Sequence, residues 1–255
     1  MTTALLETAG LRVAVPGRVL VDHLDSTVRK GEFVALLGGN GAGKSLLLRT
    51  LAGLRAPAAG HVLLAGSDIQ AVNRREVAKR LGFLPQDPEA PPQGSVRETV
   101  LLGRFAHLGF WEPAGSAEEN RAQRALAEVG LTGLADRDLA SLSGGEQRRA
   151  AIARLLVQAP AIYLLDEPTN HLDPAQQLGV LRSLHALTRA GSAVIASLHD
   201  PNLALRFANR VALLPGTGAM EIIDTRSLDT GHLGRLYGLD YAEARIGAQR
   251  FMAPG

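Results

Sequence analysis

Cysteine is absent from the 255 residues of this chain. That absence excludes a disulfide framework, a cysteine-ligated metal site and thiol catalysis. An excess of charge of one sign is missing too, because 27 basic and 25 acidic residues leave a formal net charge of +2. This balance gives no reason to expect a polyanion as the partner, so we expect a protein that binds no nucleic acid.

Long apolar runs are also absent. No run approaches the ~18 residues that a membrane-spanning helix needs, and the first residues lack the basic and apolar regions of a signal peptide. We therefore expect a soluble, cytoplasmic chain. The length of 255 residues allows one large core, or one core with a smaller appended domain.

Short apolar runs that end in Gly, Pro or acidic residues alternate with helical patterns along most of the chain. The runs FVALL, LGFLP, IYLLDE, AVIAS and RVALLPG are of this kind. This alternation predicts an α/β fold with a mainly parallel sheet covered on both faces, and functional residues at the carboxyl ends of its strands.

Four segments follow from the same pattern. Residues 1–85 form the first part of the core, opening with short strands that we interpret as an antiparallel β edge. Residues 86–141 are rich in helical pattern without strands and form a small helical insertion. Residues 142–225 complete the core. Residues 226–255 form a tail, which we expect to pack on the core rather than to act as a sensor.

Lysine is scarce, since Lys30, Lys44 and Lys79 are the only three lysines. Lys44 lies in the stretch GGNGAGKS, between the apolar run FVALL and the helical pattern SLLLRTLA. This is the strand, loop and helix context of the pattern G-x-x-x-x-G-K-[ST]. A glycine-rich turn with a solvated lysine is the alternative, and the context disfavours it.

The loop has the physical features of a phosphate site. Successive amides around glycines form a concave nest for a β-phosphate, and the following helix dipole adds positive potential. Lys44 can reach the β- and γ-phosphates, and the Ser45 hydroxyl can ligate Mg²⁺. The predicted nucleotide-binding residues of the loop are Gly38, Gly39, Asn40, Gly41, Ala42, Gly43, Lys44 and Ser45.

Two carboxylates follow a second apolar run, in the stretch AIYLLDEP. Asp166 is placed to hold Mg²⁺, through water, and Glu167 to polarise an attacking water as a general base. An acidic pair at a strand end can also be a solvated turn or a helix cap. The glycine loop upstream favours the catalytic interpretation.

A second glycine-rich turn precedes a helical pattern, in the stretch LSGGEQ. Ser143 and Glu146 have the spacing of a capping box, which by itself requires no glycine. Gly144 and Gly145 cost backbone entropy unless something approaches closely. With Ser143, their amides could bind a γ-phosphate, and the phosphate held at Lys44 of another copy is the obvious candidate.

These motifs together resemble those of the ATP-binding cassette (ABC) ATPases, along nearly the whole chain. GGNGAGKS resembles the Walker A loop of that family, LPQ with Gln86 its Q-loop, and LSGGEQ its signature. IYLLDEP resembles its Walker B strand, NHLD with Asp173 its D-loop, and SLHD with His199 its switch histidine.

The resemblance implies a RecA-like P-loop NTPase fold, with ATP and Mg²⁺ as cofactors. It also implies a head-to-tail dimer of two copies, in which each ATP lies between one Walker A loop and the other chain's signature. Gln86 would touch Mg²⁺, His199 would contact the γ-phosphate or the attacking water, and Asp173 would lie at the nucleotide. Outside this context, Gln86 and His199 are more often ordinary loop and strand-end residues.

Among the departures from the family pattern, two concern the nucleotide. Leu46 stands where a threonine usually follows the Walker A serine, which removes a hydroxyl near the α-phosphate and predicts a modest loss of affinity. Val15 aligns with the aromatic residue that usually stacks on adenine, so stacking here is weak or comes from elsewhere.

The stretches VLLGRFAHLG and HDPNLALRFANRVALL resemble subunits that import iron-siderophores, haem or cobalamin, although Ala106 replaces a usual proline. This implies a bacterial importer with separate permease subunits and an extracytoplasmic substrate-binding protein. The chain would then lie at the cytoplasmic face of the membrane, attached through the permease. Phe105, Phe110 and Trp111 are core aromatics of the insertion or permease contacts.

Other functions remain open. The chain could energise an importer for another substrate, such as a metal ion, or be a soluble mechanical ATPase. The short stretch between Gln86 and Ser143 disfavours the latter, because repair cassettes carry long coiled coils there. A clamp that binds ATP without hydrolysis is a third alternative, which the presence of both Glu167 and His199 disfavours.

Overall fold

The computed structural model describes residues 4–86, 93–109 and 114–255. Its centre is a six-stranded sheet in the order β10-β9-β3-β8-β7-β6, in which only β10 runs antiparallel to its neighbour. The strands are β3 (Phe33–Leu37), β6 (Leu81–Leu84), β7 (Ile162–Leu165), β8 (Ala193–Ser197), β9 (Arg210–Leu213) and β10 (Glu221–Asp224). The predicted α/β fold with a mainly parallel sheet is confirmed.

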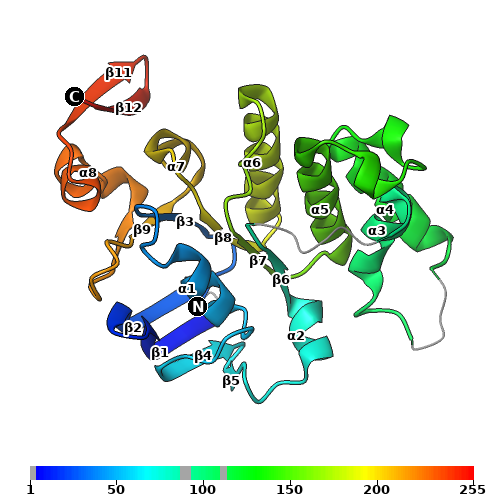
Figure 1. The fold of residues 1–255 in the computed structure, drawn as a ribbon, viewed down its shortest axis with the longest axis horizontal. Coiled ribbons are helices and arrows are strands. Elements are labelled where there is room, and N and C mark those ends of the chain that lie inside the picture. The colour runs from blue at the N-terminus through cyan, green and yellow to red at the C-terminus, as the bar shows by residue number, and fades with distance from the viewer. Residues whose placement is uncertain (1–3, 87–92, 110–113) are drawn as a thin grey trace.

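The central sheet is covered on both faces, as the continuous apolar strands predict. Phe33, Ala35 and Leu37 of β3 belong to one core cluster, and Val34 and Leu36 belong to another. The first cluster lies under helices on one side of the sheet (Figure 1). These helices are α5 (Gly144–Gln158), α6 (Pro174–Arg189), α7 (Pro201–Phe207) and α8 (Thr230–Tyr237).

The N-terminal strands form a sheet of their own, rather than an edge of the central one. This antiparallel sheet has the order β2-β1-β4-β5. Its strands are β1 (Ala4–Val15), β2 (Arg18–Arg29), β4 (Ala59–Leu64) and β5 (Ser67–Asp68). The antiparallel edge of the central sheet is instead β10, which pairs with β9.

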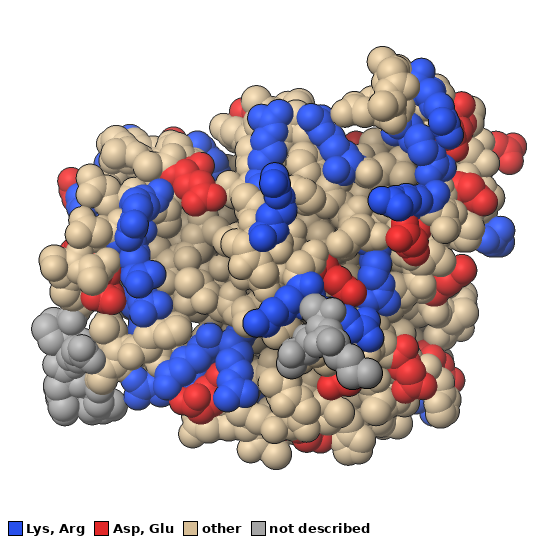
Figure 2. All heavy atoms as spheres, turned by 180° about the vertical axis from the view of Figure 1, so that it is seen from behind, with Lys and Arg blue, Asp and Glu red and all other residues tan. Residues whose placement is uncertain are grey.

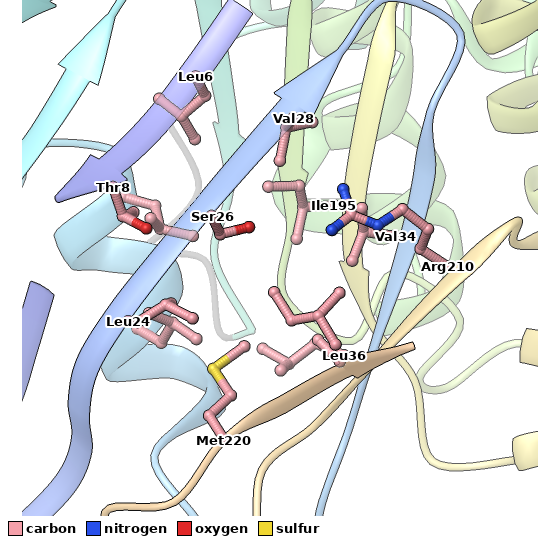
Figure 3. A pocket seen from close by; sticks show the side chains of 14 residues that line it. Leu6, Thr8, Leu24, Ser26, Val28, Val34, Leu36, Ile195, Arg210 and Met220 are labelled. Atoms are coloured by element: carbon pink, nitrogen blue, oxygen red, sulfur yellow. The ribbon is translucent and has the colours of Figure 1, made fainter. Parts of the chain in front are cut away.

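Burial explains why these strands form a separate layer. Apolar side chains of β1, β2 and β4 share one core cluster with α1 (Lys44–Leu51) and with the second face of β3. A small cavity of about 40 Å³ remains between the two sheets, with Leu24 on one side and Leu36 and Ile195 on the other (Figure 3). The two sheets with α1 therefore hold the start of the glycine loop in a packed core.

A helical subdomain lies between β6 and β7 in the sequence and at one end of the molecule in space (Figure 1). Its elements are α3 (Val96–Leu101), η1 (Leu102–Arg104), α4 (Ser116–Glu128), η2 (Thr132–Leu134) and η3 (Leu139–Ser141). Buried residues of α3, α4 and α5 belong to the same core cluster. The helix α2 (Arg74–Arg80) leads from the antiparallel sheet into β6.

The C-terminal segment contains η4 (Thr225–Ser227), α8 and a hairpin of β11 (Tyr241–Ile246) and β12 (Gln249–Pro254). Leu233 and Met252 belong to the core cluster under the helices. The Asn202 side chain on α7 accepts a hydrogen bond from the Met252 amide at 2.7 Å and donates one to the Met252 carbonyl at 3.0 Å. The hairpin is thus attached to the helix that follows His199.

The surface carries charges of both signs. On the face seen in Figure 2, Lys and Arg side chains lie in several separate groups, with Asp and Glu side chains among them. Among the helices of the described residues, none combines the length and the apolar character needed to cross a membrane.

Candidate functional site

The glycine loop connects β3 to α1. Gly41 and Gly43 have φ angles of 72° and 103°, in the left-handed region where glycine is favoured, and Gly43 is the N-cap of α1. A Cβ at Gly38 would lie 2.4 Å from the Leu214 carbonyl oxygen. The sequence therefore needs glycine where the loop turns and where it passes the end of β9.

Lys44 is the buried cation of this loop. Its Nζ donates hydrogen bonds to the carbonyl oxygens of Gly38, at 2.8 Å, and Gly39, at 3.2 Å. Burial lowers the pKa of Lys44, and the nearby carboxylates of Glu167 and Asp166 oppose this by raising it. The ammonium is thus held where an anion would face it from the open side of the loop.

A cavity of about 550 Å³ opens over the loop. Residues from four separate parts of the chain line it, which brings the ends of β3, β6, β7 and β8 to one place. The lining residues are Gly39, Asn40, Gly41, Ala42, Gly43, Lys44, Ser45, Leu46, Gln86, Glu167, Asn170 and His199.

The Glu167 carboxylate contacts three polar side chains in this cavity. Its Oε2 accepts hydrogen bonds from Gln86 Nε2, at 2.9 Å, and from Asn170 Nδ2. His199 Nε2 lies 2.7 Å from its Oε1. The backbone of Glu167 has a φ of 49°, a conformation that non-glycine residues rarely adopt and that is concentrated at functional sites. Three side chains from three loops therefore fix one carboxylate.

Asp166 lies beneath Glu167 and is 1% exposed. The Ser197 hydroxyl donates to Asp166 Oδ1, at 2.8 Å, and accepts from the Glu167 amide, at 2.7 Å. Ser197 ends β8, so it joins the neighbouring strand to both carboxylate residues. Asp166 itself is not among the described residues that line the cavity.

Ser197 and Asn170 are site residues that the sequence analysis missed. Asn170 opens the NHLD stretch and Ser197 closes the apolar run AVIAS, so a polar residue at a strand end was the available signal. That signal does not say which residue its side chain contacts.

The second glycine-rich turn has the capping box that its spacing predicts. The Ser143 hydroxyl accepts from the Glu146 amide, and Glu146 Oε2 accepts from the Ser143 amide at 2.8 Å. Ser143, Gly144 and Gly145 do not line the cavity of their own chain, as far as the described residues show. A Cβ at Gly144 would meet no atom within 4 Å, so this turn presents bare backbone.

Asp173 is also outside the lining of the cavity. Its side chain accepts from the Gln176 amide at 2.8 Å and is the N-cap of α6. The carbonyl oxygen of His171 lies 3.0 Å from the position of a Cβ on Gly145, so the segment before Asp173 packs against the second glycine turn.

The positions that depart from the family pattern lie in different places. Leu46 lines the cavity, whereas Val15 is half-buried and packs against the core of the antiparallel sheet. Phe105 is 77% exposed, so it is not a core aromatic. Phe110 and Trp111 lie outside the described residues.

The site suits a nucleotide with Mg²⁺. The loop offers backbone amides and a buried ammonium, and two carboxylates follow the end of β7. No group of three His, Asp or Glu side chains within residues 4–86, 93–109 and 114–255 could hold a metal. Mg²⁺ takes few protein ligands and shares substrate phosphates and water, and Ser45 and Gln86 line the cavity. Asp166 does not line it, so it would act on Mg²⁺ through water.

Comparison with known proteins points the same way. The family model described as ABC transporter matches residues 21–170. The chain is 41% identical to the ferric enterobactin transport ATP-binding protein of Escherichia coli (strain K12), over 86% of this chain and 82% of that protein. It is 42% identical to the hemin import ATP-binding protein of Rhodopseudomonas palustris, over 80% of this chain and 76% of that protein.

Solved structures include an inward-facing metal-chelate type ABC transporter. One of its chains has 30% identity and a TM-score of 0.83, over 99% of this chain and 98% of that chain. A dimeric ATP-binding cassette in a post-hydrolysis state with ADP and Pi has 26% identity and a TM-score of 0.76, over 88% of this chain and all of that chain. The glycine loop, the carboxylates at the end of β7 and this similarity lead to one conclusion: the chain belongs to the ABC transporter family, as an ATPase cassette.

Proposed function

We propose that this chain is the ATP-hydrolysing subunit of a bacterial importer for an iron-siderophore, haem or cobalamin. It works as a dimer on a separate permease at the cytoplasmic face of the membrane, in a system that also has an extracytoplasmic substrate-binding protein. The observation that carries the proposal is the meeting of Lys44, Gln86, Glu167 and His199 at one cavity. The curated relatives named for import of iron chelates and haem support the choice of cargo.

Each residue of the cavity has a separate task in hydrolysis. Lys44 exchanges the carbonyl oxygens of Gly38 and Gly39 for the β- and γ-phosphate oxygens, and the loop amides hold the same phosphates. Ser45, Gln86 and Asp166 would hold Mg²⁺, which would supply positive charge against the developing negative charge of the phosphates. Asp173 belongs to the nucleotide-facing surface of the dimer.

Glu167 and His199 act on the attacking water. Glu167 accepts a hydrogen bond from the water and orients it in line with the γ-phosphate, while His199 contacts the γ-phosphate or the same water. Gln86 and Asn170 already bond Glu167, so their movement governs when the carboxylate is available. Glu167 is thus the general base whose position the surrounding loops control.

The second glycine turn serves the second copy of the chain. Its backbone and Ser143, Gly144 and Gly145 lie away from their own cavity, and they bind the γ-phosphate held by the partner's Walker A loop. A two-fold dimer lets one sequence supply both halves of two identical sites. ATP therefore holds the dimer together until it is hydrolysed.

The permease docks on the helical subdomain. Leu102 and Phe105 are large apolar side chains that are 50% and 77% exposed. Arg75 on α2 donates to the Ala106 carbonyl at 3.0 Å, so this apolar surface is attached to the core that holds Gln86. A permease helix that packs against this surface would therefore be coupled to movements of the Q-loop.

The test is purification of the tagged chain from detergent-solubilised native membranes, followed by mass spectrometry of the chains that co-purify. We expect a polytopic permease in equal amount, and its relatives identify the cargo. The Phe105→Glu variant should lose the permease, whereas Ile246→Glu, at an apolar residue 70% exposed on β11, should keep it.

Other results reject parts of the proposal. Ribosomes or repair factors in place of a permease would indicate a soluble mechanical ATPase. A permease related to metal-ion importers would change the cargo. Tight ATP binding without turnover by the purified complex would indicate a clamp that does not hydrolyse ATP.

A further inference from the structure

Arg148 is a buried charged residue for which the functions above give no role. It lies in the first turns of α5, the helix capped by Ser143, and is 4% exposed. Burying a guanidinium is costly unless its donors are satisfied, so the contacts it makes indicate why it is there.

Its donors bind the main chain of two different loops. Nη2 donates to the carbonyl oxygens of Glu167, at 2.8 Å, and Asp166. Nη1 donates to those of Gln86, at 3.1 Å, and Pro85. All four acceptors directly follow β6 and β7, which are parallel neighbours in the central sheet.

The geometry requires an arginine. A guanidinium presents a planar fork of donors that can serve two pairs of acceptors at once, whereas an ammonium is a compact point charge. The start of the Q-loop and the end of the Walker B strand are therefore fixed to each other and to α5. These are the loops that carry Gln86 and Glu167, whose side chains meet at 2.9 Å.

The same helix begins at the signature turn. Any displacement of the N-terminal end of α5 moves the guanidinium, and with it the main chain on either side of the Gln86–Glu167 contact. A signature that docks on the nucleotide of a second copy would displace or fix this end of the helix. Within one chain, a single side chain thus joins the signature turn to the loops that carry Gln86 and Glu167.

We propose that Arg148 is a positioning residue that transmits docking of the signature on the partner's nucleotide to Gln86 and Glu167 of its own site. This inference rests on the proposed ATP-driven dimer. Coupling between the two sites makes hydrolysis at one depend on occupancy of the other, and therefore gives a sigmoidal dependence of rate on ATP concentration.

The test compares Arg148→Lys with Arg149→Lys. Arg149 is the next residue of α5, and its Nη1 donates to the carbonyl oxygens of Val129 and Gly130 in the helical subdomain. We expect Arg148→Lys to lower kcat about tenfold, change KM for ATP by less than about twofold and convert the sigmoidal dependence to a hyperbolic one. The control should remain within about twofold of the wild type and sigmoidal.

The shape of the ATP dependence separates positioning from stability. A merely structural role would lower the melting temperature and the folded fraction, but would leave the curve sigmoidal. A folded Arg148→Lys chain with a sigmoidal curve therefore overturns the proposal, whatever its kcat. A wild type that forms no dimer with ATP would instead reject the proposed function.

A second variant and a measurement on the wild type test the proposal if Arg148→Lys does not fold. Arg148→Gln can donate to one loop only and should give the same loss of sigmoidal behaviour. In the wild-type chain, a non-hydrolysable ATP analogue should slow hydrogen exchange at the amides of Gln86, Asp166 and Glu167 together with those at the start of α5. Unchanged exchange at these two loops on dimerisation would contradict the proposal.

Discussion

Glu167, the general base that we propose, is held in place by the side chains around it. It receives Gln86 and Asn170 on one oxygen and faces His199 on the other. Each of these neighbours comes from a different loop, so the carboxylate is sensitive to any loop that moves. If Glu167 is the general base, as we propose, its contacts with these loops control hydrolysis.

Glu167→Gln should bind ATP and dimerise but turn over poorly, because an amide has the shape of the carboxylate without its basicity. We expect kcat to fall by on the order of 10² or more. Steady-state ATPase activity and ATP-dependent size-exclusion chromatography measure the two effects. Glu128→Gln, at an exposed residue of α4, is the control and should be unaffected. Normal turnover by Glu167→Gln would remove the general-base role.

The glycine loop and the acidic pair could be predicted from the residues themselves, whereas Gln86 and His199 were predicted only from the resemblance to the ABC ATPases. The glycine loop and the acidic pair each lie within one turn or strand end. Ser197 and Arg148 could not be placed in this way, because their hydrogen-bond partners are far away in the sequence. Ser197 bonds Asp166, 31 positions away, and the partners of Arg148 lie 18 to 63 positions away. Only the packing of the strands brings such residues to the site.

At the scale of the elements, the strands and helices follow the periodicity of the sequence, while the partners of the strands do not. The apolar runs became β3, β6, β7, β8 and β9 of the central sheet, as predicted. The N-terminal strands were expected at an edge and form a separate sheet. Periodicity shows which face of a strand is apolar, but not which layer covers it, and here α1 covers it.

The junction of η1 with α5 depends on the absence of a side chain. A Cβ at Gly103 would lie 2.2 Å from the Arg154 carbonyl oxygen and 3.1 Å from the Gln158 amide nitrogen. Gly103→Ala should therefore lower the free energy of unfolding by about 1–3 kcal/mol. Gly133→Ala in η2, where a Cβ meets nothing within 4 Å, should change it by less than about 0.5 kcal/mol. Urea unfolding of both variants decides this, and equal stabilities would mean that η1 can move away freely.

The helix α3 begins with a capping box that gives the protein a pH-dependent contribution to stability. Glu98 Oε2 accepts from the Ser95 amide at 2.7 Å and from its hydroxyl at 2.9 Å. These bonds lower the pKa of Glu98 below its ordinary value of 4.5. A lowered pKa in the folded state means that the stabilisation is complete above pH 4.5 and is lost as the pH falls through the folded value.

Glu98→Gln should remove this dependence, because an amide keeps the acceptor but does not titrate. Thermal unfolding between pH 7 and pH 3 is the measurement. The difference in melting temperature between wild type and Glu98→Gln should shrink or reverse as the pH falls below 4.5. A difference that stays constant over this range would contradict the shift. Other carboxylates titrate in both chains and cancel in the comparison.

At the scale of the whole molecule, the two halves of each nucleotide site come from different chains in the proposed dimer. The Walker A cavity opens over the carboxyl ends of the central strands, and the signature turn lies outside it. In the proposed head-to-tail dimer, one chain therefore cannot complete a site alone. In a head-to-tail dimer, unlike a dimer in which each chain holds a whole site, the two damaged halves of a nucleotide site can come from different chains. Two inactive variants should therefore complement each other.

In the proposed dimer, Lys44→Ala should destroy the phosphate-binding half of a site, and Ser143→Arg should destroy the signature half. In a dimer of two Lys44→Ala chains, or of two Ser143→Arg chains, every site has one damaged half. In a mixed dimer, one site combines both damaged halves and the other combines the intact Walker A of one chain with the intact signature of the other. Equal amounts of the two variants should therefore recover ATP-dependent association that neither shows alone.

Different affinity tags on the two variants let the mixed dimer be captured and its ATP content measured, with about one nucleotide per dimer expected from the symmetry. The variants are best made in the Glu167→Gln chain, so that slow turnover preserves the complex. Capture of one variant by the other without ATP would show a dimer held by other surfaces. Failure to recover association with ATP would mean that Lys44 and Ser143 do not meet across the interface, and the head-to-tail dimer would have to be abandoned.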